Sequence, residues 1–107
     1  MNYITLIDKN FLNNYYHDEI GVLIMKNIFP DIDKSKLDDF YIKIGQNVKK
    51  IRKEKGLSQL ELAIMIGQKS TSYYSNCENY KNKEHFNLEH LFLIANVLNI
   101  EIEEFFK

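Results

Sequence analysis

The sequence has few residues of the types that cross-link a chain or interrupt its helices. It contains one cysteine, one proline, four glycines and no tryptophan among 107 residues. The single cysteine, Cys77, cannot form an internal disulfide, which fits a reducing cytoplasm. No apolar run approaches the ~18 residues that a membrane-spanning helix needs. The first residues also lack a basic segment that leads into an apolar one, so we expect neither a membrane span nor a signal peptide.

The sequence also lacks the residue patterns of catalysis and metal binding. His17, His85 and His90 are scattered, and none has a cysteine partner at zinc-ligand spacing. There is no Ser–His–Asp order, no glycine-rich phosphate loop and no close acidic pair. Cys77 has no partner cysteine, so we interpret it as a small buried apolar residue rather than a redox or metal site. We therefore expect no enzymatic activity, no metal and no cofactor.

The charge is distributed unevenly along the chain. The formal net charge is −1, which by itself argues against a nucleic-acid binder. However, residues 41–83 carry nine basic and three acidic residues, whereas the segments before and after them are net acidic. A positive field confined to the central third would attract phosphates. The same lysines would also fit a solvated helix face, so charge alone leaves both interpretations open.

Residues 1–37 are predicted to form a separate, helical N-terminal extension. Apolar residues recur there at three-to-four-residue spacing, which predicts one or two helices interrupted near Gly21. The only proline, Pro30, lies among aspartates and a serine, a composition typical of a turn or linker. The extension is a candidate contact for a second copy or another protein through its aromatic residues Tyr3, Phe11, Tyr15 and Tyr16.

From residue 36 onward the apolar spacing becomes regular and predicts helices. The first is expected over residues 36–55, with Asp38 and Asp39 as its acidic first turn. Gly56 follows basic residues and is a suitable stop. Ser58 then has the spacing of a capping box for a second helix, with Glu61 as its partner and Gly67 at its end.

Three more helices complete the expected fold. They are predicted over residues 70–79, over residues 87–98 with Asn87 as N-cap, and over residues 101–106. Residues 38–107 should therefore form an all-α domain, a bundle of five helices with short connections. The second and third helices, joined by a glycine turn, would be a helix-turn-helix unit.

Several short motifs follow one another at a specific spacing in this region. Gly-Leu-Ser-Gln at 56–59 is followed by Leu-Ala at 62–63, Ile-Gly at 66–67 and Glu-Asn at 78–79. Together with Ile44-Gly45 and the apolar tail of residues 87–98, this combination resembles the lambda repressor and Cro-like helix-turn-helix family, often called XRE. The resemblance implies a five-helix bundle that places its third helix in the major groove of double-stranded DNA.

The sequence departs from the family pattern in three places. The segment from Gly67 to Glu78 is one residue longer than in most members. Tyr80 stands where members usually have glycine, and because tyrosine tolerates the left-handed conformation poorly, we expect the chain to leave this helix differently. Residues 1–37 have no counterpart in the minimal family domain.

The resemblance also implies structural roles. Arg52 and Glu78 match positions that pair across the bundle, and such a pair would fix the first helix against the third; the alternative is two solvated charges. Ala63 stands where the second and third helices cross. Tyr74 and Cys77 align with apolar core positions.

The remaining positions near the third helix are the candidate base-reading residues. They are Lys69, Ser70, Thr71, Ser72, Tyr73, Ser75 and Asn76. Asn76 has the amide that bonds adenine in a bidentate manner, and the Thr71 methyl suits a thymine methyl. One of the hydroxyls at 70–72 is expected to cap the helix instead. Because the helix has no arginine, we expect an A·T-leaning site with much shape readout.

The candidate phosphate contacts are mostly lysines. Gln59 matches the family's backbone-contacting glutamine, and the lysines in this set are Lys49, Lys53, Lys69, Lys81 and Lys83. Such contacts position a protein on DNA without specifying sequence.

We expect a homodimer, because such domains usually bind two half-sites as two-fold pairs. Ile100, Ile102, Phe105 and Phe106 are a candidate dimer surface, with closure of the domain's own core as the alternative. The leading hypothesis is a bacterial or phage transcriptional regulator, a repressor. A second is an antitoxin or operon controller whose residues 1–37 bind a partner protein, and a third is a helix-turn-helix fold used only for protein contact.

Overall fold

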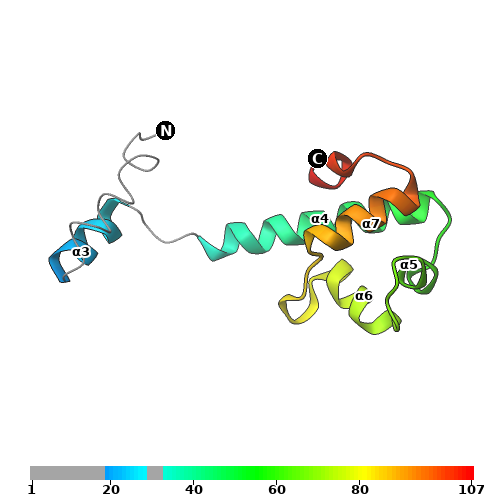
Figure 1. The fold of residues 1–107 in the computed structure, drawn as a ribbon, viewed down its shortest axis with the longest axis horizontal. Helices are drawn as coiled ribbons and strands as arrows, with labels where there is room; N and C mark the ends of the chain where they lie inside the picture. The colour runs from blue at the N-terminus through cyan, green and yellow to red at the C-terminus, as the bar shows by residue number, and fades with distance from the viewer. Residues whose placement is uncertain (1–18, 29–32) are drawn as a thin grey trace. The chain divides into compact units, whose positions relative to one another are not determined.

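The computed structural model describes residues 19–28 and 33–107, which belong to two compact units, residues 1–33 and 34–107. In the first unit, helix α3 (Glu19–Ile28) runs without a break through Gly21, so the interruption predicted there is wrong (Figure 1). The side chains of Ile20 and Leu23 on α3 are 67% and 61% exposed. The predictions for the extension's aromatic residues, His17 and Pro30 lie outside the described residues.

The second unit is helical throughout. Its elements are α4 (Lys34–Glu54), α5 (Gln59–Met65), α6 (Thr71–Asn79), the short 3-10 turn η1 (Lys81–Lys83), α7 (Leu88–Leu98) and the 3-10 turn η2 (Ile102–Phe106) (Figure 1). No strand occurs within residues 19–28 and 33–107. The all-α fold class is therefore confirmed, with the fifth predicted helix present as a 3-10 turn.

Helix α4 begins earlier than its sequence pattern suggests. It starts at Lys34, so Asp38 and Asp39 lie in its second turn rather than in an acidic first turn, which α4 does not have. The prediction for these two aspartates is wrong because sequence patterns locate the ends of a helix less precisely than its existence. Asp38 instead forms contacts with the segment that follows α6, described below.

The predicted caps of α5 and α7 and the predicted stop of α4 are confirmed. Ser58 Oγ accepts a hydrogen bond from the Glu61 amide at 3.0 Å, and the Glu61 carboxylate accepts one from the Ser58 amide at 3.1 Å, which completes the capping box. Asn87 caps α7, its Oδ1 accepting from the His90 amide at 2.7 Å. Gly56 has φ of +74°, a left-handed conformation that ends α4 without Cβ strain.

One continuous core joins the helices of the second unit. Val48, Leu62, Tyr74, Ile94 and Phe105 are fully buried, so every α-helix of the unit and η2 contribute to it. Burial of Phe105, with Ile100 and Ile102 packed against the core, favours core closure over dimer contact for this part of the C-terminal cluster. Phe106 remains 42% exposed.

Helices α4 and α6 approach each other closely at a glycine. A Cβ atom added to Gly45 would lie 2.3 Å from the Glu78 carbonyl oxygen, a distance that no real contact reaches. Only glycine therefore lets the α6 backbone pack so near α4. This close approach sets how far α6 projects from the domain.

Candidate nucleic-acid interface

Helix α6 has one buried face and one polar outward face. Tyr74, Cys77 and Glu78 are buried. Because successive residues in an α-helix turn by about 100°, Ser72, Asn76 and Asn79 lie on the opposite side. Ser72 and Asn79 are exposed and Asn76 is half-buried. This face presents hydroxyl and amide groups and no charge, a composition suited to hydrogen bonding with base edges.

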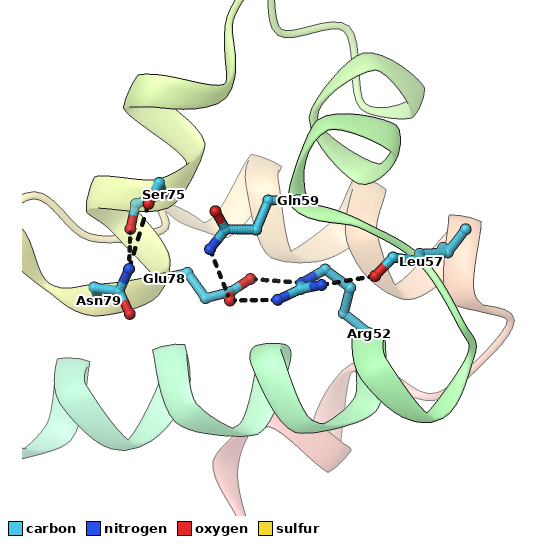
Figure 2. Close-up of polar contacts among 6 residues, drawn as sticks. All are labelled: Arg52, Leu57, Gln59, Ser75, Glu78 and Asn79. Atoms are coloured by element: carbon cyan, nitrogen blue, oxygen red, sulfur yellow. Dashed lines mark hydrogen bonds and ion pairs between the residues drawn. The ribbon is translucent and has the colours of Figure 1, made fainter.

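A buried ion pair holds the inner face of α6. The Arg52 guanidinium binds the Glu78 carboxylate through two hydrogen bonds of 2.9 Å, and its third nitrogen, Nη1, donates to the Leu57 carbonyl at 2.6 Å (Figure 2). Arg52 is 5% exposed and Glu78 is 3% exposed. The pair expected from the sequence is thus present, and it connects α4, the turn before α5, and α6.

The charge state of this pair follows from its partners. Burial by itself would raise the pKa of Glu78, but hydrogen bonds from Arg52 and Gln59 outweigh burial and hold that pKa below its ordinary value. The hydrogen bonds that Arg52 donates to Glu78 raise the pKa of Arg52. Both groups therefore remain ionised. A bidentate pair of this kind fixes the rotation of α6 about its own axis, because the fork geometry tolerates little displacement.

Gln59 belongs to the same network. Its side-chain nitrogen donates to Glu78 Oε1 at 3.2 Å, so the start of α5 is connected to α6 (Figure 2). One of its two amide hydrogens is therefore already engaged. The contact of Gln59 with the DNA backbone stays a prediction. In the structure, Gln59 connects α5 to α6 through Glu78.

The candidate reading residues at the start of α6 are placed as follows. Lys69 and Ser70 precede the helix and are exposed, and Thr71 begins it half-buried. Ser70 occupies the N-cap position, but its side chain makes no capping hydrogen bond. The Ser70 hydroxyl, one of the three expected to cap α6, therefore does not cap it.

Tyr73 does not lie with the other candidates. Its ring packs edge-on against His90 of α7, with ring centres 5.8 Å apart, although it is still 42% exposed. At 100° per residue it flanks the outward face rather than sharing it. The structure thus places Ser72 and Asn76 on the outward face of α6, with Ser75 and Tyr73 on its two flanks and Tyr73 on the flank towards α7.

Asn79 is a candidate that the sequence reasoning missed. It lies three residues after Asn76 on the outward side, and its side-chain nitrogen donates to the Ser75 carbonyl at 3.0 Å and hydroxyl at 3.3 Å (Figure 2). The helical spacing from Asn76 was the available signal. From the sequence, Asn79 enters only as part of the Glu-Asn motif at 78–79 that carries the family resemblance.

Lysines flank α6 at both ends. Lys69 precedes the helix and Lys81 follows it, both exposed. Lys83 lies in η1 with Nζ 3.4 Å from Asp38 Oδ1, an exposed pair in which the lysine side chain is 73% accessible. Pairs of this kind are weak and exchange readily. Lys53 is exposed and Lys49 is half-buried one turn before it on α4.

Tyr80 leaves α6 in the left-handed conformation, with φ of +53°. The expectation that the chain would leave this helix differently is therefore wrong. Tertiary contacts stabilise the unusual conformation: the Tyr80 ring stacks on Tyr41, and Tyr41 stacks on His85 with ring centres 3.8 Å apart. The Tyr80 hydroxyl also donates to Asp38 at 2.5 Å. These contacts hold the segment that carries Lys81 and Lys83.

Other chemistry has little support in the described residues. No group of three or more His, Cys, Asp or Glu side chains within residues 19–28 and 33–107 is arranged to hold a metal. Cys77 is 1% exposed, and burial raises the pKa of its thiol, which disfavours the reactive thiolate. Among the described helices, none has the length and apolar character of a membrane span.

A comparison with known families agrees with this geometry. A family model for helix-turn-helix proteins matches residues 48–105, which is more than half of the chain and includes α5 and α6 in full. No curated protein and no solved structure matches the sequence. The motif spacing, the paired helices α5 and α6 and this match lead to one conclusion: the chain belongs to the helix-turn-helix family of lambda repressor and Cro-like DNA-binding proteins.

Proposed function

We propose that this protein is a sequence-specific transcriptional regulator, a repressor, that reads double-stranded DNA with α6 in the major groove. The observation that carries the proposal is the division of α6 into two faces. Its inner face is held by the buried Arg52–Glu78 pair, while its outer face presents Ser72, Asn76 and Asn79. A helix that is fixed on one side and polar on the other suits direct readout of bases.

The distribution of charge supports phosphate contact around this helix. Lys69 and Lys81 stand at the two ends of α6, and both are exposed. Lys49 and Lys53 add positive charge on α4. Cations placed at both ends of a reading helix would bind the phosphates that border a major groove, and they would fix its register.

The outer face favours A·T-rich sites. The amide of Asn76 fits the donor and acceptor pattern of adenine, and Thr71 offers a methyl group for thymine. No arginine lies between residues 53 and 107, so the bidentate contact to guanine that arginine provides is not available from α6. Two copies reading two half-sites would supply the affinity that one short uncharged face lacks.

Selection of bound duplexes from random DNA tests the proposal. We expect enrichment of an A·T-leaning motif with two half-sites about one helical turn apart. Affinity should fall steeply with salt, and Lys81→Ala should reduce the slope of log K against log salt by about one. Lys50→Ala, an exposed lysine of α4 outside the candidate set, is the matched control. If the protein bound no duplex at low salt, the proposal would be wrong, and the fold would serve protein contact instead.

A second candidate function, an antitoxin or operon controller, is favoured by α3. Its exposed Ile20 and Leu23 offer an apolar contact for a partner protein. Ile20→Glu with Leu23→Glu in the full chain should then abolish co-purification of that partner while DNA binding is unchanged. Retention of the partner by this variant would count against the antitoxin function.

A further inference from the structure

Helices α4 and α7 border an apolar hollow that the base-reading helix does not use. The hollow has a volume of about 300 Å³, and its lining includes Phe40, Tyr41 and Ile44 from α4, Leu88 and Leu91 from α7, and Phe106. No residue of α5 or α6 lines it. An occupant of this site would therefore leave the outward face of α6 accessible.

Large apolar side chains stand exposed around the same hollow. Phe40 is 49% exposed, Leu88 is 75% exposed and Phe106 is 42% exposed. Leu37 precedes Phe40 by one helical turn and is 41% exposed, and Phe92 follows Leu88 by one turn and is 60% exposed. At about 200 Å² for a side chain of this size, the five expose roughly 500 Å² of apolar surface. Patches this large on a soluble protein commonly mark an interaction site.

The surface combines a hollow with exposed apolar side chains. Leu88 lines the hollow, and Phe92 lies one turn after it on α7; both side chains are exposed. A two-fold axis brings a protrusion on one copy to the corresponding hollow on the other, because both copies use the same patch. A side chain of Phe92's size fits a hollow of this volume.

The charges beside the patch are also complementary between two copies. On α4, Lys36 and Lys43 lie one turn before and one turn after Phe40, and both are exposed. On α7, the exposed Glu89 lies one turn before Phe92. A pairing that seats Phe92 of one copy near Phe40 of the other therefore brings Glu89 of the first copy towards Lys36 and Lys43 of the second. With these charged side chains the surface approaches the ~800 Å² per partner that stable complexes bury.

We propose that the α4–α7 surface, defined by Leu37, Phe40, Leu88, Phe92 and Phe106, binds the same surface of a second copy of this chain. The inference names the contact of the homodimer proposed above. It does not depend on DNA reading, because association is measured without DNA. This surface also differs from the C-terminal cluster that the sequence suggested as a dimer contact, because Phe106 is the only member of that cluster that belongs to it.

Analytical ultracentrifugation of the full chain without DNA tests this surface. We expect a dimer at micromolar concentration and, for Leu88→Glu with Phe92→Glu, a dissociation constant raised at least about 100-fold. Both side chains are more than half exposed, so the domain should remain folded, as circular dichroism would show. The control is Leu60→Glu with Ile64→Glu on α5, which also replaces two large apolar side chains, 51% and 62% exposed, with glutamates; this control should stay dimeric.

A charge exchange provides a second test that leaves the apolar surface intact. Lys43→Glu alone and Glu89→Lys alone should each weaken the dimer about three- to ten-fold, because each places like charges together across the interface. The two changes combined in one chain should restore most of the affinity, since the two-fold axis pairs them with each other. A wild-type monomer at every concentration would overturn the proposal and leave another protein or another segment as the occupant. Two results would show that this surface is not the contact. One is a dimer weakened by the α5 control variant but not by the α7 variant, and the other is a double charge variant whose loss of affinity equals the sum of the two single losses.

Discussion

The hydroxyl of Tyr80 lies 2.5 Å from the carboxylate of Asp38, which is 42 residues earlier in the chain. This contact connects the N-terminal part of α4 to the residue that ends α6. Asp38 and Tyr41, the residue on which the Tyr80 ring stacks, both precede residue 48, where the family match begins. The early turns of α4 lie outside the matched region. They therefore add a support for the lysine-bearing segment after α6 that the matched residues alone do not provide.

Substitution of Asp38 should change the ionisation of Tyr80. The hydrogen bond to Asp38 favours the protonated phenol and raises the pKa of Tyr80 to about 12, from an ordinary value of 10.0. Asp38→Asn should therefore return the pKa of Tyr80 towards 10.0, as measured by NMR of ring-labelled tyrosine. Asp39→Asn, on the exposed neighbouring residue, should leave it unchanged. A wild-type Tyr80 that titrates at the ordinary value of 10.0 would contradict the contact.

Substitution of Glu78 should be strongly destabilising. Glu78→Gln leaves the Arg52 guanidinium buried without its counter-charge, a loss that costs about 3–5 kcal/mol in comparable pairs. Glu54→Gln, an exposed change on α4, is the control and should have little effect. Urea unfolding monitored by circular dichroism measures both variants.

The stability difference between wild type and Glu78→Gln should also depend on pH. The folded pKa of Glu78 lies below its ordinary value of 4.5. The ionised carboxylate therefore contributes stability in full above pH 4.5, and that contribution is lost as the pH falls through the folded pKa. The two unfolding midpoints should converge on acidification, and a difference that widened below pH 4.5 would show that the sign is wrong.

A methyl group at Gly45 should displace α6. The added Cβ would meet the Glu78 carbonyl at 2.3 Å, and because this neighbour is backbone, the helices must separate. We expect Gly45→Ala to destabilise the domain by about 1–3 kcal/mol and to weaken DNA binding beyond that loss, since α6 would be misplaced even in the folded fraction. Gln46→Ala, at the exposed neighbouring position, should affect neither unfolding nor fluorescence anisotropy with DNA.

Asn76 should contribute to specificity rather than to general affinity. Asn76→Ala removes the amide that we assign to adenine, and the discrimination at one A·T pair should fall by about 1–3 kcal/mol. Competition between the selected duplex and single-base variants measures this loss, and binding to unrelated DNA should hardly change. Asn96→Ala, at an exposed position of α7, should leave the preference intact. Equal weakening on every duplex would reassign Asn76 to backbone contact.

The sequence alone determined the parts of this protein that depend on short-range signals. The capping box at Ser58, the N-cap at Asn87 and the left-handed Gly56 are recognisable because all the interacting groups lie within a few residues of one another. Burial of Tyr74 and Cys77 follows from the helical period combined with the family spacing. The family itself rests on the same local motifs, which is why it was identifiable before the structure.

The features that join distant segments depend on how the helices pack. Tyr80 adopts a conformation that its side chain disfavours, because Tyr41 and Asp38 supply a stack and a hydrogen bond from another helix. Gln59 is engaged by Glu78, and Tyr73 turns towards His90. None of these outcomes is encoded in a local pattern, since each depends on which helix faces the residue after packing. The α4–α7 hollow has the same origin: residues 40 and 88 form one surface only when their helices meet.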